Sequence, residues 1–159
     1  DDFAYMPQQN IAHAMTTLMA QNKGAKKTDR IKAAFRCGMK IELFYGIFIF
    51  FVCFFLAHPL MQLFSNDPVV CKHGVTYLKL ISLMYLFPAV TNGVQGYFRG
   101  IGDLKITLIS SFVNMSVRVI FAAVLVFHFS LQIEALPFSY LAGWIGMLLA
   151  EVPLLLRKF

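Results

Sequence analysis

The apolar run from Leu43 to Ala57 most constrains what this chain can fold into. It contains no charged side chain, and it continues through His58 and Pro59 to about Phe64. The hydrocarbon core of a bilayer is about 30 Å thick, and about 20 mainly apolar residues of α-helix cross it. We therefore expect this segment to span a membrane.

The composition extends this expectation to the whole chain. Hydrophobic residues make up 58% of the 159 positions and charged residues only 14%, against about 45–50% and 25% in average soluble domains. So few charges cannot cover a soluble core that holds 17 Phe and 8 Met. A disordered chain would be less hydrophobic, and a disulfide scaffold would have denser cysteine. The predicted fold is an all-α, polytopic transmembrane helix bundle.

About five spanning helices are expected, joined by short turn-rich or charged stretches. The first is the least apolar, because glutamine, asparagine, histidine and threonine interrupt it. The chain opens without an initiator methionine, so we expect it to be part of a longer protein. The expected spans are residues 3–21, 43–64, 80–98, 106–129 and 137–156.

Positive charges orient these spans. Seven of the 14 Lys and Arg residues lie between Lys23 and Lys40, whereas the opposite ends of the spans hold only Lys72. Since cytoplasmic loops collect Lys and Arg, residues 23–40 are predicted to be cytoplasmic, and 65–73 and 130–136 external. Four more cations stand at span ends on the cytoplasmic side: Arg99, Lys105, Arg157 and Lys158.

Residues 26–36 combine a cationic face with Ile31, Ala34 and Phe35. This pattern predicts a short helix lying on the inner leaflet, where anionic lipids attract positive charge. Membrane lipid, and not nucleic acid, is therefore the expected partner of the net charge of +6.

Arg118 is a candidate functional residue because of its depth. It lies about 20 Å along a helix from the cytoplasmic Lys105, too deep to reach either interface easily, whereas Lys79 can snorkel to the outer interface. An ionisable group inside a membrane is costly and commonly functional. Ser111 and Asn114 share its helical stripe.

Two further spans carry polar stripes. One passes through Tyr85, Asn92 and Gln95, and the other through Gln9 and His13. Such stripes suit a water-filled substrate cavity, but they also suit hydrogen bonding between helices, so both interpretations stay open. The candidate cavity residues are Gln9, His13, Tyr85, Asn92, Gln95, Ser111, Asn114 and Arg118.

Several spacings make structural predictions. Pro88 removes a backbone donor near the middle of its span, so it is the expected kink and hinge. Gly96 and Gly100 form a GxxxG pair suited to close helix contact, and Ala20 with Gly24 forms a looser small-residue pair.

Catalytic and metal sites are not indicated. The acidic residues lie mostly in loops or at span ends, the three cysteines have no metal-ligand spacing, and no carboxylate pair can be placed together. Glu151, about two turns inside the last span, is expected to pair with Arg157, Lys158 or another interfacial cation.

Two stretches resemble the multidrug and toxic-compound extrusion (MATE) transporters. Met19 to Ile31 contains Gln21, Asn22, Gly24 and Ala25 in an order similar to that family's Gln-Asn-x-Gly-Ala helix end. The second stretch resembles the family's Arg-Gly-x-Gly-Asp turn between helices and consists of Arg99, Gly100, Ile101, Gly102 and Asp103. The chain departs from the pattern at Lys26, where a third small residue is usual, and it lacks a proline after Asp103.

The resemblance implies a fold and a function. It implies a twelve-helix transporter of two six-helix lobes, of which this chain is similar to helices eight to twelve. It further implies a Na⁺- or H⁺-coupled antiporter, with no enzymatic activity and no cofactor, that exports amphipathic compounds across the plasma membrane by alternating access. The bacterial cytoplasmic membrane and a missing amino-terminal lobe are the implied setting and partner.

The coupling cation is expected in that missing lobe. Some family members bind it with an acid in the helix equivalent to the third span here, but no acid lies between Asp67 and Asp103. Two alternatives stay open: a lipid-linked saccharide flippase of the same superfamily, and a membrane scaffold that does not transport.

Overall fold

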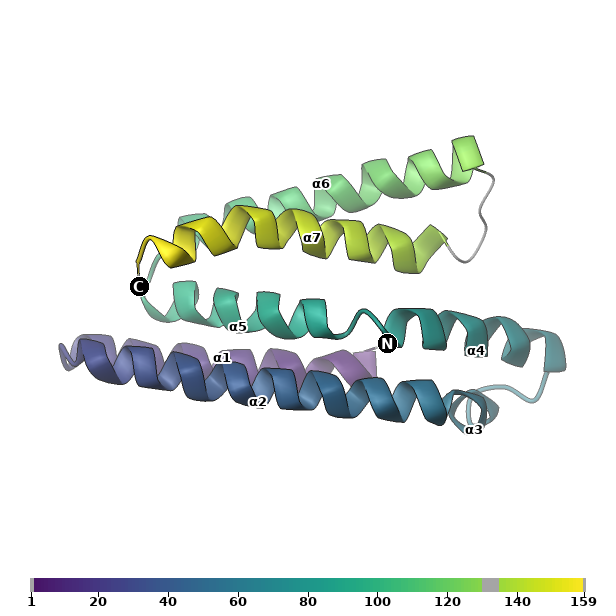
Figure 1. The fold of residues 1–159 in the computed structure, drawn as a ribbon, viewed down its shortest axis with the longest axis horizontal. Coiled ribbons are helices and arrows are strands. Elements are labelled where there is room, and N and C mark those ends of the chain that lie inside the picture. The colour runs from purple at the N-terminus through teal and green to yellow at the C-terminus, as the bar shows by residue number, and fades with distance from the viewer. Residues whose placement is uncertain (1, 130–134, 159) are drawn as a thin grey trace.

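The computed structural model describes residues 2–129 and 135–158. Within these ranges every element of regular secondary structure is an α-helix, which confirms the predicted all-α bundle (Figure 1). The helices are α1 (Asp2–Gly24), α2 (Thr28–Phe55), α3 (Ala57–Gln62), α4 (Pro68–Ser82), α5 (Leu86–Gly100), α6 (Leu104–Phe129) and α7 (Ala135–Leu156). Most of the predicted external segment 130–136 lies outside the described residues.

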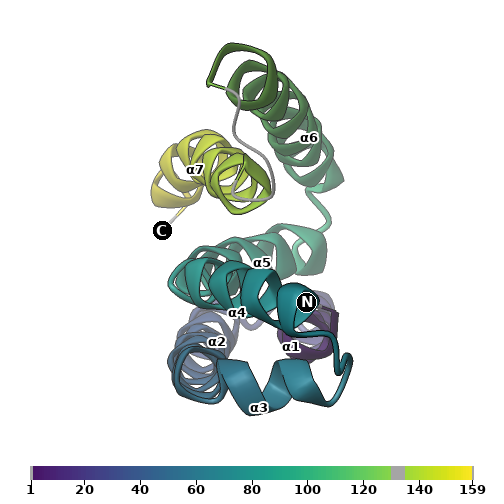
Figure 2. The ribbon, with the colours of Figure 1, turned by 90° about the vertical axis from the view of Figure 1, so that its right-hand side faces the viewer.

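Helix α5 lies at the centre of the bundle. Seen end-on in Figure 2, α1 and α2 lie on one side of it and the α6–α7 pair on the other. Every residue from Thr91 to Phe98 is buried. The polar groups of α5 are therefore enclosed by helices on both sides.

Glycines permit the close approach of α1 to α5. A Cβ atom at Gly96 would lie 2.9 Å from the carbonyl oxygen of Ala12, and one at Gly100 would lie 2.6 Å from Met19 Cβ. The predicted GxxxG contact is thus confirmed. The contact predicted for Ala20 and Gly24 is wrong: Ala20 is exposed, and no described atom lies within 4 Å of a Cβ placed at Gly24.

Residues 26–36 do not form a separate short helix, which corrects the sequence-based prediction. Helix α2 is continuous from Thr28 to Phe55, because no proline interrupts it. It ends before the predicted limit of Phe64. Pro59 has no N–H to donate to the carbonyl of Phe55, so the chain breaks at Leu56 and the short α3 follows.

Length and apolarity qualify three helices to cross a membrane, namely α2, Leu104–His128 of α6, and α7. The pair α4 and α5 qualifies together as a fourth, bent span. Five spans were predicted. The remaining candidate, α1, is 23 residues long, but it is not apolar enough to qualify as a span by the same criterion. It packs along α5.

The bend between α4 and α5 measures 51° and lies one turn before Pro88. Pro88 cannot donate to the carbonyl of Met84, which instead accepts from Phe87 N at 3.0 Å. Gln8 of α1 donates to the Tyr85 carbonyl at 3.3 Å. The predicted kink is confirmed, whereas movement about it stays a prediction.

Candidate functional site

A cavity of about 410 Å³ is lined by α5, α6 and α7, together with Tyr5 of α1 and Ile81 of α4. This volume lies within the range of small-molecule sites, about 300–1,000 Å³. The lining residues are Tyr5, Ile81, Tyr85, Thr91, Asn92, Gln95, Ser111, Asn114, Met115, Arg118, Tyr140, Trp144 and Met147.

Six of the eight predicted cavity residues line this one space: Tyr85, Asn92, Gln95, Ser111, Asn114 and Arg118. The two from the first span do not. Gln9 and His13 lie on an exposed face of α1, whereas the neighbouring Gln8 is fully buried. Ala12 and Met15 define the buried face of α1, and a step of one residue turns a side chain by about 100° around a helix.

Arg118 points to an aromatic ring and not to an acid. Its guanidinium carbon lies 3.8 Å from the ring centroid of Tyr140. Gly143 leaves room for the arginine stem, since a Cβ there would lie 2.8 Å from Arg118 Cδ. Among the described residues Arg118 makes no hydrogen bond to Asn114, which shares its helical stripe, and the ring face is the group that offsets this cation.

Hydrogen bonds between helices hold the cavity walls. Gln95 Nε2 donates to Ser111 Oγ at 3.4 Å, which joins α5 to α6. Asn114 Nδ2 lies 3.6 Å from the sulfur of Met147 in α7. Tyr5 donates to Asn92 Oδ1 at 3.2 Å. The polar stripes therefore link helices and line the cavity at once, so the two interpretations of them are compatible.

The two motif stretches form the same kind of helix end. At the end of α1, Lys26 N donates to Lys23 O and Lys27 N donates to Asn22 O, both at 2.9 Å. Lys26 has a positive φ of 56°. This paired pattern is a Schellman cap, in which the residue with positive φ is usually glycine.

At the end of α5 the pattern recurs with glycine in that position. Gly102 N donates to Arg99 O at 3.0 Å, Asp103 N donates to Phe98 O at 2.9 Å, and Gly102 has φ of 76°. The motif residues Gln21, Asn22, Gly24, Ala25, Arg99, Gly100, Gly102 and Asp103 thus belong to two equivalent turns.

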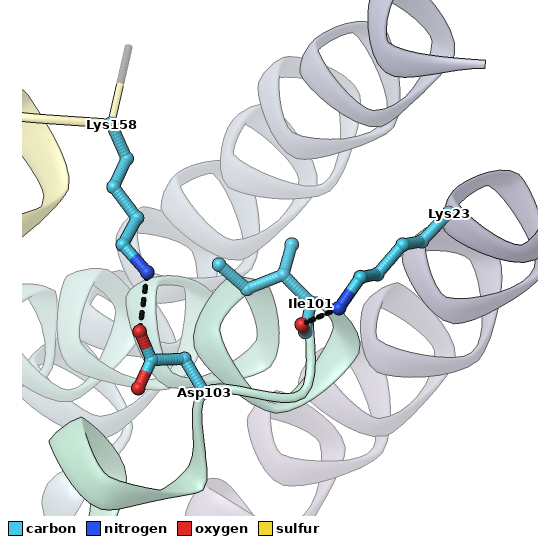
Figure 3. A network of polar contacts seen from close by, with 4 residues as sticks. All are labelled: Lys23, Ile101, Asp103 and Lys158. Carbon is cyan, nitrogen blue, oxygen red and sulfur yellow. Dashed lines mark hydrogen bonds and ion pairs between the residues drawn. The ribbon is translucent and has the colours of Figure 1, made fainter. Parts of the chain in front are cut away.

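Charged side chains tie these turns together at one end of the bundle (Figure 3). Lys23 donates to the carbonyl of Ile101, and Lys158 forms an ion pair with Asp103. These contacts link the ends of α1, α5 and α7. The prediction that the motif turns and the final cations share one face is therefore confirmed.

The sequence reasoning did not predict the full burial of two acids. Glu42 in α2 and Glu151 in α7 are both 0% exposed. The carboxylate oxygens of Glu42 have no hydrogen-bond partner among the described residues, whereas Ser110 and Gln95 face the Glu151 carboxyl. Among the described residues Glu151 forms no ion pair with Arg157 or Lys158, since Lys158 binds Asp103. The third part of that prediction, another interfacial cation, agrees with Arg99 of α5, which acts on Glu151 electrostatically. The available signal was periodicity: Ser139, Gly143, Met147 and Glu151 recur every four residues on the buried face of α7.

A metal centre is not formed by the part of the chain that the structure describes, where no three His, Cys, Asp or Glu residues cluster. The buried carboxyls are separate single groups.

The family model described as MatE matches residues 1–124. The chain belongs to the MatE family. The resemblance expected from the two turn motifs is thereby confirmed, because the match includes both turns.

Curated relatives of this MatE chain are named as multidrug resistance proteins or, in one case, as a transporter. It is 26% identical over 149 residues to the probable multidrug resistance protein NorM of Thermotoga maritima, covering 93% of this chain and 31% of that protein. It is 25% identical over 146 residues to the protein of the same name from Halalkalibacterium halodurans, covering 92% and 31%. It is also 26% identical over 102 residues to an FAD transporter of Shewanella oneidensis, covering 62% and 23%.

A solved structure shares the fold. It is described as the inward-facing conformation of a multidrug resistance MATE family transporter of the MOP superfamily, and it matches with a TM-score of 0.84 at 17% identity. The match covers 98% of this chain and 36% of that one. The MatE chain thus spans about a third of the length of the first two relatives.

Proposed function

We propose that this chain forms part of a cation-coupled antiporter that exports amphipathic organic compounds across the plasma membrane by alternating access. The names of its relatives support this proposal. The observation that carries it is the cavity, which combines aromatic faces with amide, hydroxyl and guanidinium groups at the level of the helix interiors. Such a lining suits a ligand with an apolar body and a polar group.

Different cavity residues can contact the apolar body and the polar group of such a ligand. Tyr140 and Trp144 offer ring faces to an apolar or aromatic body, with ring centroids 5.8 Å apart. Asn92 and Asn114 offer amide groups that can orient a polar substituent. We propose that an amino-terminal lobe completes the opposite wall and that the two lobes alternate around the ligand.

A second candidate substrate class is anionic. Arg118 places a positive charge in the cavity without an acidic partner among the described residues, and a guanidinium suits phosphate. The relative named as an FAD transporter supports this candidate, and a lipid-linked saccharide flippase would also carry an anionic head group.

The test compares transport of a cation and an anion by the full gene product that contains these residues. The protein is reconstituted in vesicles, and uptake of ethidium or FAD is measured under an imposed Na⁺ gradient or H⁺ gradient. Ethidium transport under one gradient is the expected result. FAD transport alone would favour the anionic candidate.

Matched variants connect transport to the cavity. Trp144→Ala removes a lining ring and should weaken ethidium transport severalfold, whereas Ile145→Ala, at an exposed neighbouring position, should leave it unchanged. Absence of ethidium and FAD transport under both gradients, with the protein correctly inserted, would contradict the proposal and favour a scaffold.

A further inference from the structure

A second cavity, of about 750 Å³, lies between α3 and α4. Figure 1 shows these helices at the opposite end of the bundle from the α1–α2 turn and the end of α5. We call this cavity the α3–α4 pocket. It shares no lining residue with the cavity between α5, α6 and α7. Its lining residues are His58, Gln62, Ser65, Asn66, Pro68, Cys71, Lys72, Val75 and Thr76.

The local sequence fixes the shape of the α3–α4 pocket. Gly74 lets α3 pack on α4, because a Cβ there would lie 2.9 Å from the sulfur of Met61. The loop between the two helices is held by its own hydrogen bonds. Cys71 Sγ donates to the Ser65 carbonyl at 2.9 Å, and Asp67 N donates to Ser65 Oγ at 3.2 Å. The walls of the pocket are therefore in place before any ligand binds.

The charge of the lining favours an anion. Lys72 and His58 line the pocket from different helices, and none of the lining residues is acidic. The neighbouring Asp67 caps α4, since its Oδ1 accepts from Val69 N at 2.8 Å and from Val70 N at 3.4 Å. Lys72 forms no ion pair among the described residues. A lysine ammonium group in this setting suits a phosphate group, and His58 can add a hydrogen bond.

Uncharged polar groups complete the lining. The amide groups of Gln62 and Asn66 are exposed at the pocket and form no hydrogen bond within the part of the chain that the structure describes. Each amide can donate and accept. Together they suit hydroxyl groups attached to a bound phosphate.

Apolar side chains lie beside this polar pocket. Leu63 is 79% exposed and Phe64 is 72% exposed, and both stand in the same α3–α4 connection as the lining residues. The apolar helix α2 ends at Phe55, three residues before His58. The pocket therefore lies where a membrane span ends, at the level of the lipid head groups. A soluble anion would leave the apolar side chains in water, whereas a phospholipid covers them with its acyl chains.

We propose that the α3–α4 pocket binds an anionic phospholipid. Its phosphate lies at Lys72 and His58, its head-group hydroxyls lie at Gln62 and Asn66, and its acyl chains cover the apolar side chains beside the pocket. Phosphatidylglycerol has this chemistry, whereas a head group with its own ammonium would be repelled by Lys72. The placement of cations predicts that this leaflet is the outer one. The inference goes beyond the proposed function and does not depend on it.

Local crosslinking tests the pocket without any transport measurement. The purified full gene product in detergent is mixed with phosphatidylglycerol that carries a diazirine on an acyl chain close to the head group. After irradiation, adducts within residues 58–76 are quantified by peptide mass spectrometry. These adducts should saturate with rising probe concentration. Unlabelled phosphatidylglycerol should displace the probe, and phosphatidylcholine should not.

Matched lysine variants separate the pocket from general attraction to cations. Lys72→Gln should weaken the saturable crosslinking about tenfold, because it removes a charge-assisted contact to phosphate. Lys79→Gln removes the same charge from an exposed position about two turns further along α4, outside the lining, and should leave crosslinking unchanged. Lys72→Arg should keep most of the binding. His58→Gln tests the opposite wall and should weaken crosslinking severalfold.

Several results would overturn the inference. Equal displacement by phosphatidylcholine would show ordinary lipid contact with the surface of the bundle. Displacement by glycerol 3-phosphate at the same concentrations as by phosphatidylglycerol would assign the pocket to a soluble phosphate compound. Equal crosslinking in Lys72→Gln and the wild type would exclude Lys72 as the phosphate-binding group. The wild-type competition needs no variant, so it decides even if a substituted protein does not fold.

Discussion

The guanidinium of Arg118 in α6 lies over the ring of Tyr140 in α7, with 3.8 Å between the guanidinium carbon and the ring centroid. The two residues are far apart in sequence and meet because Gly143 lets α6 and α7 approach. An aromatic face can partly replace a carboxylate as the partner of a cation where water is excluded. This pairing makes a deep arginine tolerable while leaving it on the cavity wall.

Replacing Tyr140 tests that pairing. Tyr140→Phe keeps an aromatic face and should unfold at nearly the wild-type temperature, whereas Tyr140→Leu should lose about 1–2 kcal/mol of stability. Thermal unfolding of the purified protein in detergent measures both.

Arg118→Leu should impair efflux while membrane insertion stays near normal. Unaltered efflux of several substrates by Arg118→Leu would remove Arg118 from the candidate site.

Lys26 occupies a backbone conformation that glycine adopts more readily. Its φ is 56°, and a side chain in this region costs about 1–2 kcal/mol. Lys26→Gly should therefore stabilise the protein by about 1 kcal/mol. Lys26→Ala removes the same charge but keeps a Cβ, so it should give no such gain in a denaturation experiment. Equal effects of the two variants would show that the change in stability comes from the lost charge and not from relief of backbone strain.

Gly100 sets the distance between α1 and α5. A Cβ there would meet Met19 Cβ at 2.6 Å and Thr16 O at 2.9 Å, so Gly100→Ala should cost about 1–3 kcal/mol through overpacking. The control is Gly24→Ala, where no described atom lies within 4 Å of the new Cβ. It should leave the unfolding temperature unchanged or raise it. A harmless Gly100→Ala would contradict the close contact.

The orientation in the membrane can be tested by cysteine labelling. Single cysteines at Lys27 and Asn66 are compared in a background from which the exposed Cys37 has been removed. An impermeant maleimide should label position 66 on intact cells, and position 27 only after permeabilisation, because the cation-rich ends are predicted to be cytoplasmic. Labelling at 27 alone on intact cells would reverse the topology. Gln132, the natural choice for the second external segment, lies outside the described residues.

Local signals explain why much of the fold could be predicted. Proline acts within one turn of its own position, so Pro88 marked the α4–α5 bend and Pro59 accounts for the end of α2. The turn motif at Gly102 carries its own backbone requirement. Helix boundaries were harder to predict where no proline or turn glycine occurs. Helix α2, for example, includes the stretch that was expected to be a separate surface helix.

The cavity was predicted only in part for a related reason. Stripes on α5 and α6 identified Asn92, Gln95 and Asn114 because the spacing within one helix defines a face. Which face meets a neighbour is a property of packing. On α1, Gln8 and Gln9 are neighbours in sequence, but their side chains point about 100° apart around the helix. Packing buries Gln8 and leaves Gln9 exposed.

The sequence by itself determined that the protein is a membrane helix bundle of the MatE family, because apolar runs, cation placement and two turn motifs are local features. The tertiary structure alone decided that Arg118 lies over Tyr140, that Lys158 pairs with Asp103, and that Glu151 is fully buried in α7. Each of these depends on which side chains from separate helices come within a few ångströms, and that distance is set by how glycine-lined faces pack together.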